Sequence, residues 1–219
     1  MLQAISRSDF LRLVGVKSST LDQRVLTSEA AFALGCQRPA HVGEYHPLDP
    51  VAMLLASMLN CFAGLELRVA ADMVREHWDA WLALVTKAER YPTPDHPDQF
   101  FAVAWLSLEP GLGHRRHRVV MGEAHEIAAA LAGDSVYTAN FVSMHRVLHQ
   151  LRINAQIARP PIALPDRFTI APNEPGYENW RAEIRAYQER AEARFQARAK
   201  SKRRRPARGP PGKRPLLKV

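Results

Sequence analysis

Near the start of the chain, apolar residues recur at the spacing of a helix. Phe10 and Val14 lie four positions apart, so their side chains share one face. Gly15 follows, and glycine accepts the positive φ at which many helices end. Ser18 or Ser19 can then accept hydrogen bonds from the free N–H groups that open a second helix. The pattern predicts two short helices joined by a tight turn, an outline that helix-turn-helix modules share with small helical hairpins that have no ligand.

The segment after these helices has the size of a wing. Residues 31–34 and 42–45 each have the composition of a short strand, and 35–43 would be the loop between them. This loop carries Arg38 and His41. The pattern therefore predicts a short hairpin that follows the paired helices.

Two longer helices are predicted next. Asp49 as N-cap and Pro50 at the first helical position begin the first of them, and Gly64 ends it. Its apolar face is expected to comprise Val51, Leu54, Leu55, Met58, Leu59 and Phe62. The second helix is expected over 67–85, because apolar residues keep helical spacing throughout that stretch and charged residues occupy the opposite side.

Beyond a proline-rich linker at 91–98, the apolar runs become shorter. Residues 100–108 and 117–121 predict two strands joined by a turn, 123–131 predicts a helix, and about 140–158 predicts another. Farther on, the large residues Trp180, Ile184, Tyr187 and Ala191 recur at steps of four, three and four, which predicts a docked or self-associating helix.

Together these elements predict a mainly α protein with some β structure, that is, an α+β fold. The expected parts are a winged helix-turn-helix with its supporting helices at 1–90, the linker at 91–98, a small α+β domain at 99–198 and a tail at 199–219. The tail is expected to be disordered, because its arginine, lysine, proline and glycine residues leave little to bury.

The net charge of +8 is located in the tail. Residues 198–219 hold ten Lys or Arg and no Asp or Glu, whereas 1–197 hold twenty basic and twenty-two acidic side chains. The tail is therefore expected to contact nucleic-acid phosphates without sequence preference, with contacts that weaken as salt rises; the alternatives are contact with ribosomal or other RNA and a role in solubility alone. The candidate residues are Lys202, Arg203, Arg204, Arg205 and Arg208.

Three segments, taken in order, resemble the MerR-like winged helix-turn-helix family. Phe10–Leu21 is similar to the paired helices of that family. A wing-sized gap ends at Tyr45–Asp49, and Phe62–Leu67 is similar to the glycine-containing turn into the next helix. The resemblance covers about residues 5–90. Asp22 and Glu44 depart from it, because they stand near positions where the family usually has arginine.

The resemblance implies a double-stranded DNA partner. It would place the second helix in the major groove and bring the wing near the backbone; hydroxyls would fix the register on phosphates, and Gln and Arg would contact base edges. The candidate DNA-binding residues are Lys17, Ser18, Ser19, Thr20, Gln23 and Arg24, with Arg38 and His41 from the wing. A homodimer is expected, because one such module covers too little duplex for specificity.

Other chemistry finds less support in the sequence. His145 and His149 share a helical face, yet no carboxylate or cysteine lies at a matching interval, so no metal and no cofactor are expected. No nucleophile–base pair is visible, which argues against an enzyme. With two cysteines, no secretory leader and no membrane span in the sequence, a cytoplasmic protein is expected.

The sequence thus predicts a DNA-binding transcriptional regulator of bacterial type. The alternative is a protein-interaction or assembly factor, of the kind that packages phage DNA or adapts one component to another, in which the helix-turn-helix is only a scaffold. An enzyme in the second half of the chain is the third and weakest hypothesis.

Overall fold

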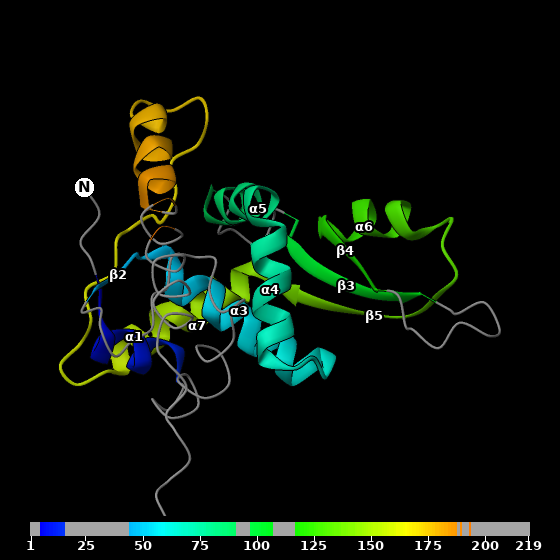
Figure 1. Ribbon diagram of the computed structural model, residues 1–219, viewed down its shortest axis with the longest axis horizontal. Coiled ribbons are helices and arrows are strands. Elements are labelled where there is room, and N and C mark those ends of the chain that lie inside the picture. The colour runs from blue at the N-terminus through cyan, green and yellow to red at the C-terminus, as the bar shows by residue number, and fades with distance from the viewer. Residues whose placement is uncertain are drawn as a thin grey trace, which may run out of the picture.

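The computed structural model describes residues 5–15, 44–90, 97–106 and 117–187, together with Glu189 and Ala193. Five of its helices pack together, and we call them the helical body (Figure 1): α1 (Arg7–Val14), α3 (Leu48–Ala63), α4 (Leu67–Glu76), α5 (Trp78–Arg90) and α7 (Met144–Ile157). An antiparallel sheet lies beside them in the order β4 (His117–Gly122), β3 (Phe100–Leu106), β5 (Val136–Ser143), with α6 (Ala124–Leu131) on its far side. This mixture of helices and sheet confirms the predicted α+β class.

The helix α3 is the centre of the helical body. Its face at Val51, Leu55 and Leu59 is fully buried, as predicted, and Gly64 ends the helix with a φ of 65°. Phe62, which the sequence places on the same face, is 69% exposed instead. The apolar face of α3 therefore turns away from the core over its last turn.

The helix predicted over 67–85 is two helices in the structure. The backbone leaves helical geometry at His77, whose φ of −108° and ψ of 26° end α4, and α5 begins at the next residue. The N–H of Trp81 still bonds to the carbonyl of His77, at 2.8 Å. Both helices bury apolar residues in the same cluster, including Val74 and Trp81. The prediction of a single helix was therefore wrong at this one position.

The sheet confirms two predicted strands and adds a third. The strands β3 and β4 pair from Phe100↔Gly122 to Trp105↔His117. Residues 136–143 form β5, so the helix expected from about 140 begins only at Met144. The reason is local, because 136–143 is rich in β-branched and aromatic residues.

One hydrophobic cluster joins the segments on either side of the expected linker. Phe101 from β3 and Leu151 from α7 belong to the same cluster as Phe10 and Leu55. The helix α7 packs against α1, α3 and α5. The linker at 91–98 therefore does not separate two hydrophobic cores.

The segment at 177–187 is a helix that docks on this body. Trp180 and Ile184 are buried in the main cluster, as the predicted docked helix requires. In Figure 1 this helix stands out from the rest of the ribbon near β2 (Glu44–Tyr45). No helix in the described ranges is long and apolar enough to cross a membrane.

Candidate functional site

The helix α1 has a defined cap at each end. The Ser6 hydroxyl accepts a hydrogen bond from the N–H of Asp9 at 3.2 Å, which satisfies one free donor of the first turn. Gly15 ends the helix with a φ of 67°, and its N–H bonds to the carbonyl of Leu11 at 3.0 Å. The predicted helix near the start of the chain, with glycine at its end, is thus confirmed.

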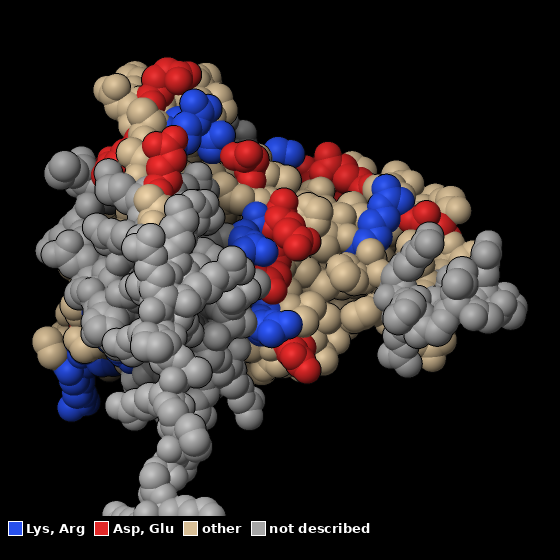
Figure 2. Space-filling model, viewed as in Figure 1, with Lys and Arg blue, Asp and Glu red and all other residues tan. Residues whose placement is uncertain are grey.

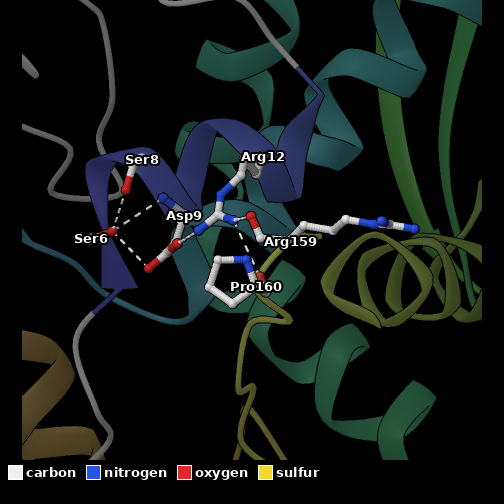
Figure 3. A network of polar contacts seen from close by, with 6 residues as sticks. All are labelled: Ser6, Ser8, Asp9, Arg12, Arg159 and Pro160. Carbon is white, nitrogen blue, oxygen red and sulfur yellow. Dashed lines mark hydrogen bonds and ion pairs between the residues drawn. The ribbon is translucent and has the colours of Figure 1, made fainter. Parts of the chain in front are cut away.

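The polar side of α1 is tied to the end of α7, as Figure 3 shows. Arg12 forms an ion pair with Asp9 and donates hydrogen bonds to the carbonyls of Arg159, at 2.9 Å, and Pro160, at 3.3 Å. Asn154 on α7 donates to the carbonyl of Leu13 at 2.6 Å. These contacts fix α1 on α7, so the two helices are expected to move together.

A two-stranded ribbon brings the chain back to α1 after residue 43. Ile5 and Ser6 form β1, which pairs antiparallel with β2 in the register Ile5↔Tyr45. The Phe10 and Tyr45 rings stack with centroids 4.3 Å apart. In the described residues β2 pairs with the N-terminus, whereas the sequence predicted a partner at 31–34, which lies outside them. Both ends of the 16–43 segment are thus anchored at α1.

The predicted site residues all lie outside the described residues. These are Lys17, Ser18, Ser19, Thr20, Gln23, Arg24, Arg38 and His41, with Lys202, Arg203, Arg204, Arg205 and Arg208 of the tail. Their arrangement at a DNA surface stays a prediction. What the structure describes is the frame from which the 16–43 segment leaves and to which it returns.

The described surface carries charges of both signs. On the face in Figure 2, lysine and arginine side chains lie next to aspartate and glutamate side chains, with no broad patch of one sign among the described atoms. Ion pairs among the described residues include Arg181–Asp79, at 3.0 Å, and Arg167–Glu174, at 2.9 Å. Phosphate binding through this face is not favoured by its charge.

A buried polar cluster joins the docked C-terminal helix to the start of α3. The Asp49 carboxylate is fully buried and accepts hydrogen bonds from the His46 N–H, at 2.8 Å, and the Tyr187 hydroxyl, at 2.9 Å. The N-cap position belongs to Pro47, so Asp49 lies inside the first turn and not at the predicted cap. Its carboxylate therefore serves tertiary packing as well as the helix end.

His46 in the same cluster is a neutral side chain. Its Nδ1 accepts from the N–H of Leu48 at 3.2 Å, and burial lowers its pKa to about 4. Its ring lies 5.1 Å from the Tyr187 ring. Charging His46 would place a cation in a desolvated cluster, which links the docking of the C-terminal helix to pH.

A second carboxylate, the partly buried Glu89 of α5, holds the segment after α7. It accepts hydrogen bonds from the Phe168 N–H at 2.7 Å, the Thr169 N–H at 3.0 Å and the Thr169 hydroxyl at 2.7 Å. Burial raises the pKa of Glu89 above its ordinary value, and the three hydrogen bonds oppose that shift. This contact could not be predicted from the sequence, because it joins residues about eighty positions apart.

A pocket of about 620 Å³ lies between α5, the residues just before β3 and the docked C-terminal helix. Its apolar walls include Leu82, Pro97 and Trp180, while two cations and two carboxylates also line it: Asp79, Lys87, Glu123 and Arg181. The charges of these four side chains balance, so the pocket favours neither an anion nor a cation.

The histidine pair of the sequence does not form a metal site in the described residues. The Nδ1 of His145 lies 2.5 Å from a carboxylate oxygen of Asp98, within hydrogen-bond distance, and His149 is exposed. No cluster of three potential metal ligands occurs in the parts of the chain that the structure describes.

The chain was compared with known protein families, with characterised proteins and with solved structures, and none of these comparisons found a match. The functional argument therefore rests on the residues and on the geometry of the site.

Proposed function

We propose that the protein is a DNA-binding transcriptional regulator that contacts its site through residues 16–43. The observation that carries this proposal is the geometry of α1. It is an eight-residue helix, capped by Ser6, and it ends at Gly15 in the left-handed conformation. A short first helix that ends in such a turn is what a helix-turn-helix requires before its second helix.

The anchoring of the 16–43 segment supports the same proposal. The segment leaves at the end of α1 and returns at β2, which pairs with the residues just before α1. The segment has 28 residues. Its two ends are separated by about the length of α1, which is about 12 Å for eight residues at 1.5 Å per residue. A second helix and a hairpin fit this length, and the frame would hold them on one side of α1.

The distribution of charge assigns different tasks to the two ends of the chain. Gln23 and Arg24 would contact base edges, whereas the tail around Arg203 and Arg204 would neutralise phosphates. The mixed charges on the face in Figure 2 add little to either. The sequence preference and the salt-dependent affinity should therefore be separable by mutation.

Selection from a pool of random duplexes with the full chain tests the proposal. We expect one enriched site, whose preference over other sequences the double variant Gln23→Ala/Arg24→Ala relaxes. Arg146→Ala is the matched control, because it removes one exposed positive charge from α7 outside the 16–43 segment. Selection without any enriched site would favour the protein-interaction or assembly factor instead.

The tail provides a second, independent measurement. Deleting 199–219 should weaken DNA binding and reduce the dependence of the binding constant on salt, while the enriched sequence stays the same. Loss of the sequence preference on this deletion alone would contradict the assignment of specificity to the 16–43 segment.

A further inference from the structure

The strand β5 forms one border of the sheet and leaves its outer edge unpaired within the described residues. The sheet order is β4-β3-β5, and Figure 1 shows β5 along the border away from α6. The body end of the strand is covered, since Val142 and Ser143 are buried. The stretch 137–141 is the part of β5 that is open to a partner.

The chemistry of β5 differs from that of most exposed edge strands. Its eight residues, Val-Tyr-Thr-Ala-Asn-Phe-Val-Ser, include no charged residue and no proline. Edge strands are ordinarily protected by such residues or by β-bulges, which oppose pairing with another chain, and β5 has only a register shift near Tyr137. The opposite border shows the contrast, because β4 carries Arg118, paired with Asp134 at 2.5 Å.

Two large aromatic residues are exposed on this strand. Tyr137 is 82% exposed and Phe141 is 46% exposed. The pairing of β3 with β5 runs from Trp105↔Thr138 to Leu106↔Val136, so the register skips Tyr137 and leaves it without a partner on β3. Aromatic side chains at such positions are typical of association surfaces.

The spacing of the two aromatic residues fits a second copy of the same strand. When two identical strands pair antiparallel about a two-fold axis normal to the sheet, residues that lie opposite each other point to the same face. One residue of the strand must therefore lie opposite its own copy, with the axis between the two. With Ala139 on the axis, Thr138 of each copy lies opposite Asn140 of the other. Tyr137 of one copy and Phe141 of the other then lie near each other at each end of the contact. Cross-strand aromatic pairs of this kind stabilise a sheet, and a strand without charge meets no like-charge repulsion from its copy.

We infer that the protein forms a homodimer in which β5 pairs antiparallel with β5 of a second copy, with Ala139 at the two-fold axis. The two three-stranded sheets then form one continuous sheet of six strands. The exposed edge and both aromatic residues are covered by the same contact.

This dimer deepens the proposed function, because β5 is linked to α1. The strand runs directly into α7, whose first turn is capped by Ser143, and Arg12 and Asn154 fix α1 to α7. The β5 contact would therefore set the separation of the two α1 helices, and with it the spacing of two DNA half-sites. The inference on half-site spacing rests on the proposed function, whereas the dimer can be measured without DNA.

Analytical ultracentrifugation of the full chain over a range of concentrations tests the dimer. Phe141→Lys should raise the dimer dissociation constant by more than about tenfold, because it places like charges at both ends of a symmetric contact. Phe62→Lys is the matched control, since it changes an exposed aromatic residue at the end of α3. A monomer at every concentration, or equal effects of both variants, would overturn the inference.

A cysteine substitution tests the register in a way that does not depend on disrupting the fold. In a Cys36→Ser/Cys61→Ser background, Ala139→Cys should form a disulfide-linked dimer under mild oxidation, because the two residues face each other across the axis. Thr138→Cys should crosslink much less, since each copy faces Asn140 of the other. Crosslinking that is equal at both positions, or stronger at 138, would contradict the register. Loss of the enriched DNA site with an intact dimer would reject the proposed function alone.

Discussion

The two faces of the sheet are covered to very different extents. On the inner face, Phe101 and Val103 belong to the large cluster that includes the helical body. On the outer face, Ala102 and Ala104 form a cluster of four buried residues with Ile127 and Leu131 of α6. The same strand, β3, thus supplies large residues to one core and small residues to the other.

The difference explains how a small sheet is stable and still has an exposed side. Small residues at 102 and 104 let α6 lie close to β3, yet α6 packs mainly over β4 and leaves Phe141 of β5 exposed. The inner face provides most of the buried apolar area and hence most of the stability. The outer face is covered by α6 over β3 and β4, while Phe141 on β5 stays 46% exposed.

The largest expected effect compares one buried residue from each face. Phe101→Ala should lower the free energy of unfolding by about 3–5 kcal/mol, since it leaves a cavity inside the main cluster. Ile127→Ala should cost about 2–3 kcal/mol, because the short helix α6 can relax toward the smaller side chain. Urea unfolding measures both, with Phe62→Ala as an exposed control.

Hydrogen exchange sharpens the same comparison. Ile127→Ala should increase the exchange of amides in α6, while those of α3 and α7 stay protected, because the outer cluster is separate from the main one. Phe101→Ala should reduce protection throughout the helical body. Equal changes for the two variants would show that the outer face is energetically part of the main core.

Local patterns predicted those elements whose apolar residues are close in the sequence. The end of α1 at Gly15 and the strands β3 and β4 follow from a few neighbouring residues. The break at His77 was missed because Val74, Trp78 and Trp81 keep helical spacing across it. The strand β5 was missed because Phe141, in the strand, and Met144 and Leu148, in α7, lie at the spacing of one helix.

The tertiary contacts could not be predicted from one sequence. Glu89 meets Phe168, and Asp49 meets Tyr187, only because distant segments pack together. A buried carboxylate carries no local signature that distinguishes it from an exposed one on a charged helix face. The predicted DNA contacts at 17–24, in contrast, rest on a local pattern alone and lie outside the described residues.

The next effect is specific to the helical body and depends on pH. Unfolded His46 takes up a proton below its ordinary pKa near 6.5, whereas burial lowers the pKa of the folded side chain to about 4. Between these values the unfolded state binds more protons, so stability is complete above about pH 6.5 and falls as the pH decreases. At pH 4.5 the lowered pKa of His46 should reduce the free energy of unfolding by about 2–3 kcal/mol relative to neutral pH.

Urea unfolding at pH 7 and pH 4.5 measures this loss. His46→Asn should make the pH dependence smaller, because asparagine can accept the Leu48 N–H without titrating in this range. His149→Asn, at an exposed position of α7, should leave the pH dependence as it is. An unchanged pH dependence in His46→Asn would contradict the assignment.

Two carboxylates that accept backbone N–H groups give a smaller effect. Glu89→Gln replaces one acceptor oxygen by an amide that faces donors, which should cost about 1–3 kcal/mol in this partly buried site. Glu126→Gln changes the exposed cap of α6, where Glu126 accepts from the Glu123 N–H at 2.8 Å, and should cost less. Thermal unfolding compares the two. A larger loss of stability for Glu126→Gln than for Glu89→Gln would contradict the expectation that the exposed cap of α6 contributes less than the contact inside the helical body.

The smallest effect compares a glycine from the helical body with one from the turn between α6 and β5. Gly15 has a φ of 67°, so Gly15→Ala should cost about 1 kcal/mol even though the space around it is open. Gly133 also has open space and does not have such a φ, so Gly133→Ala should increase stability by about 0.4–1 kcal/mol through the unfolded state. Gly15→Asn should lie between Gly15 and Gly15→Ala, because asparagine visits the left-handed region more readily than alanine. Urea unfolding at neutral pH gives all three values, and a stabilising Gly15→Ala would show that α1 does not end in the left-handed turn on which the proposed helix-turn-helix depends.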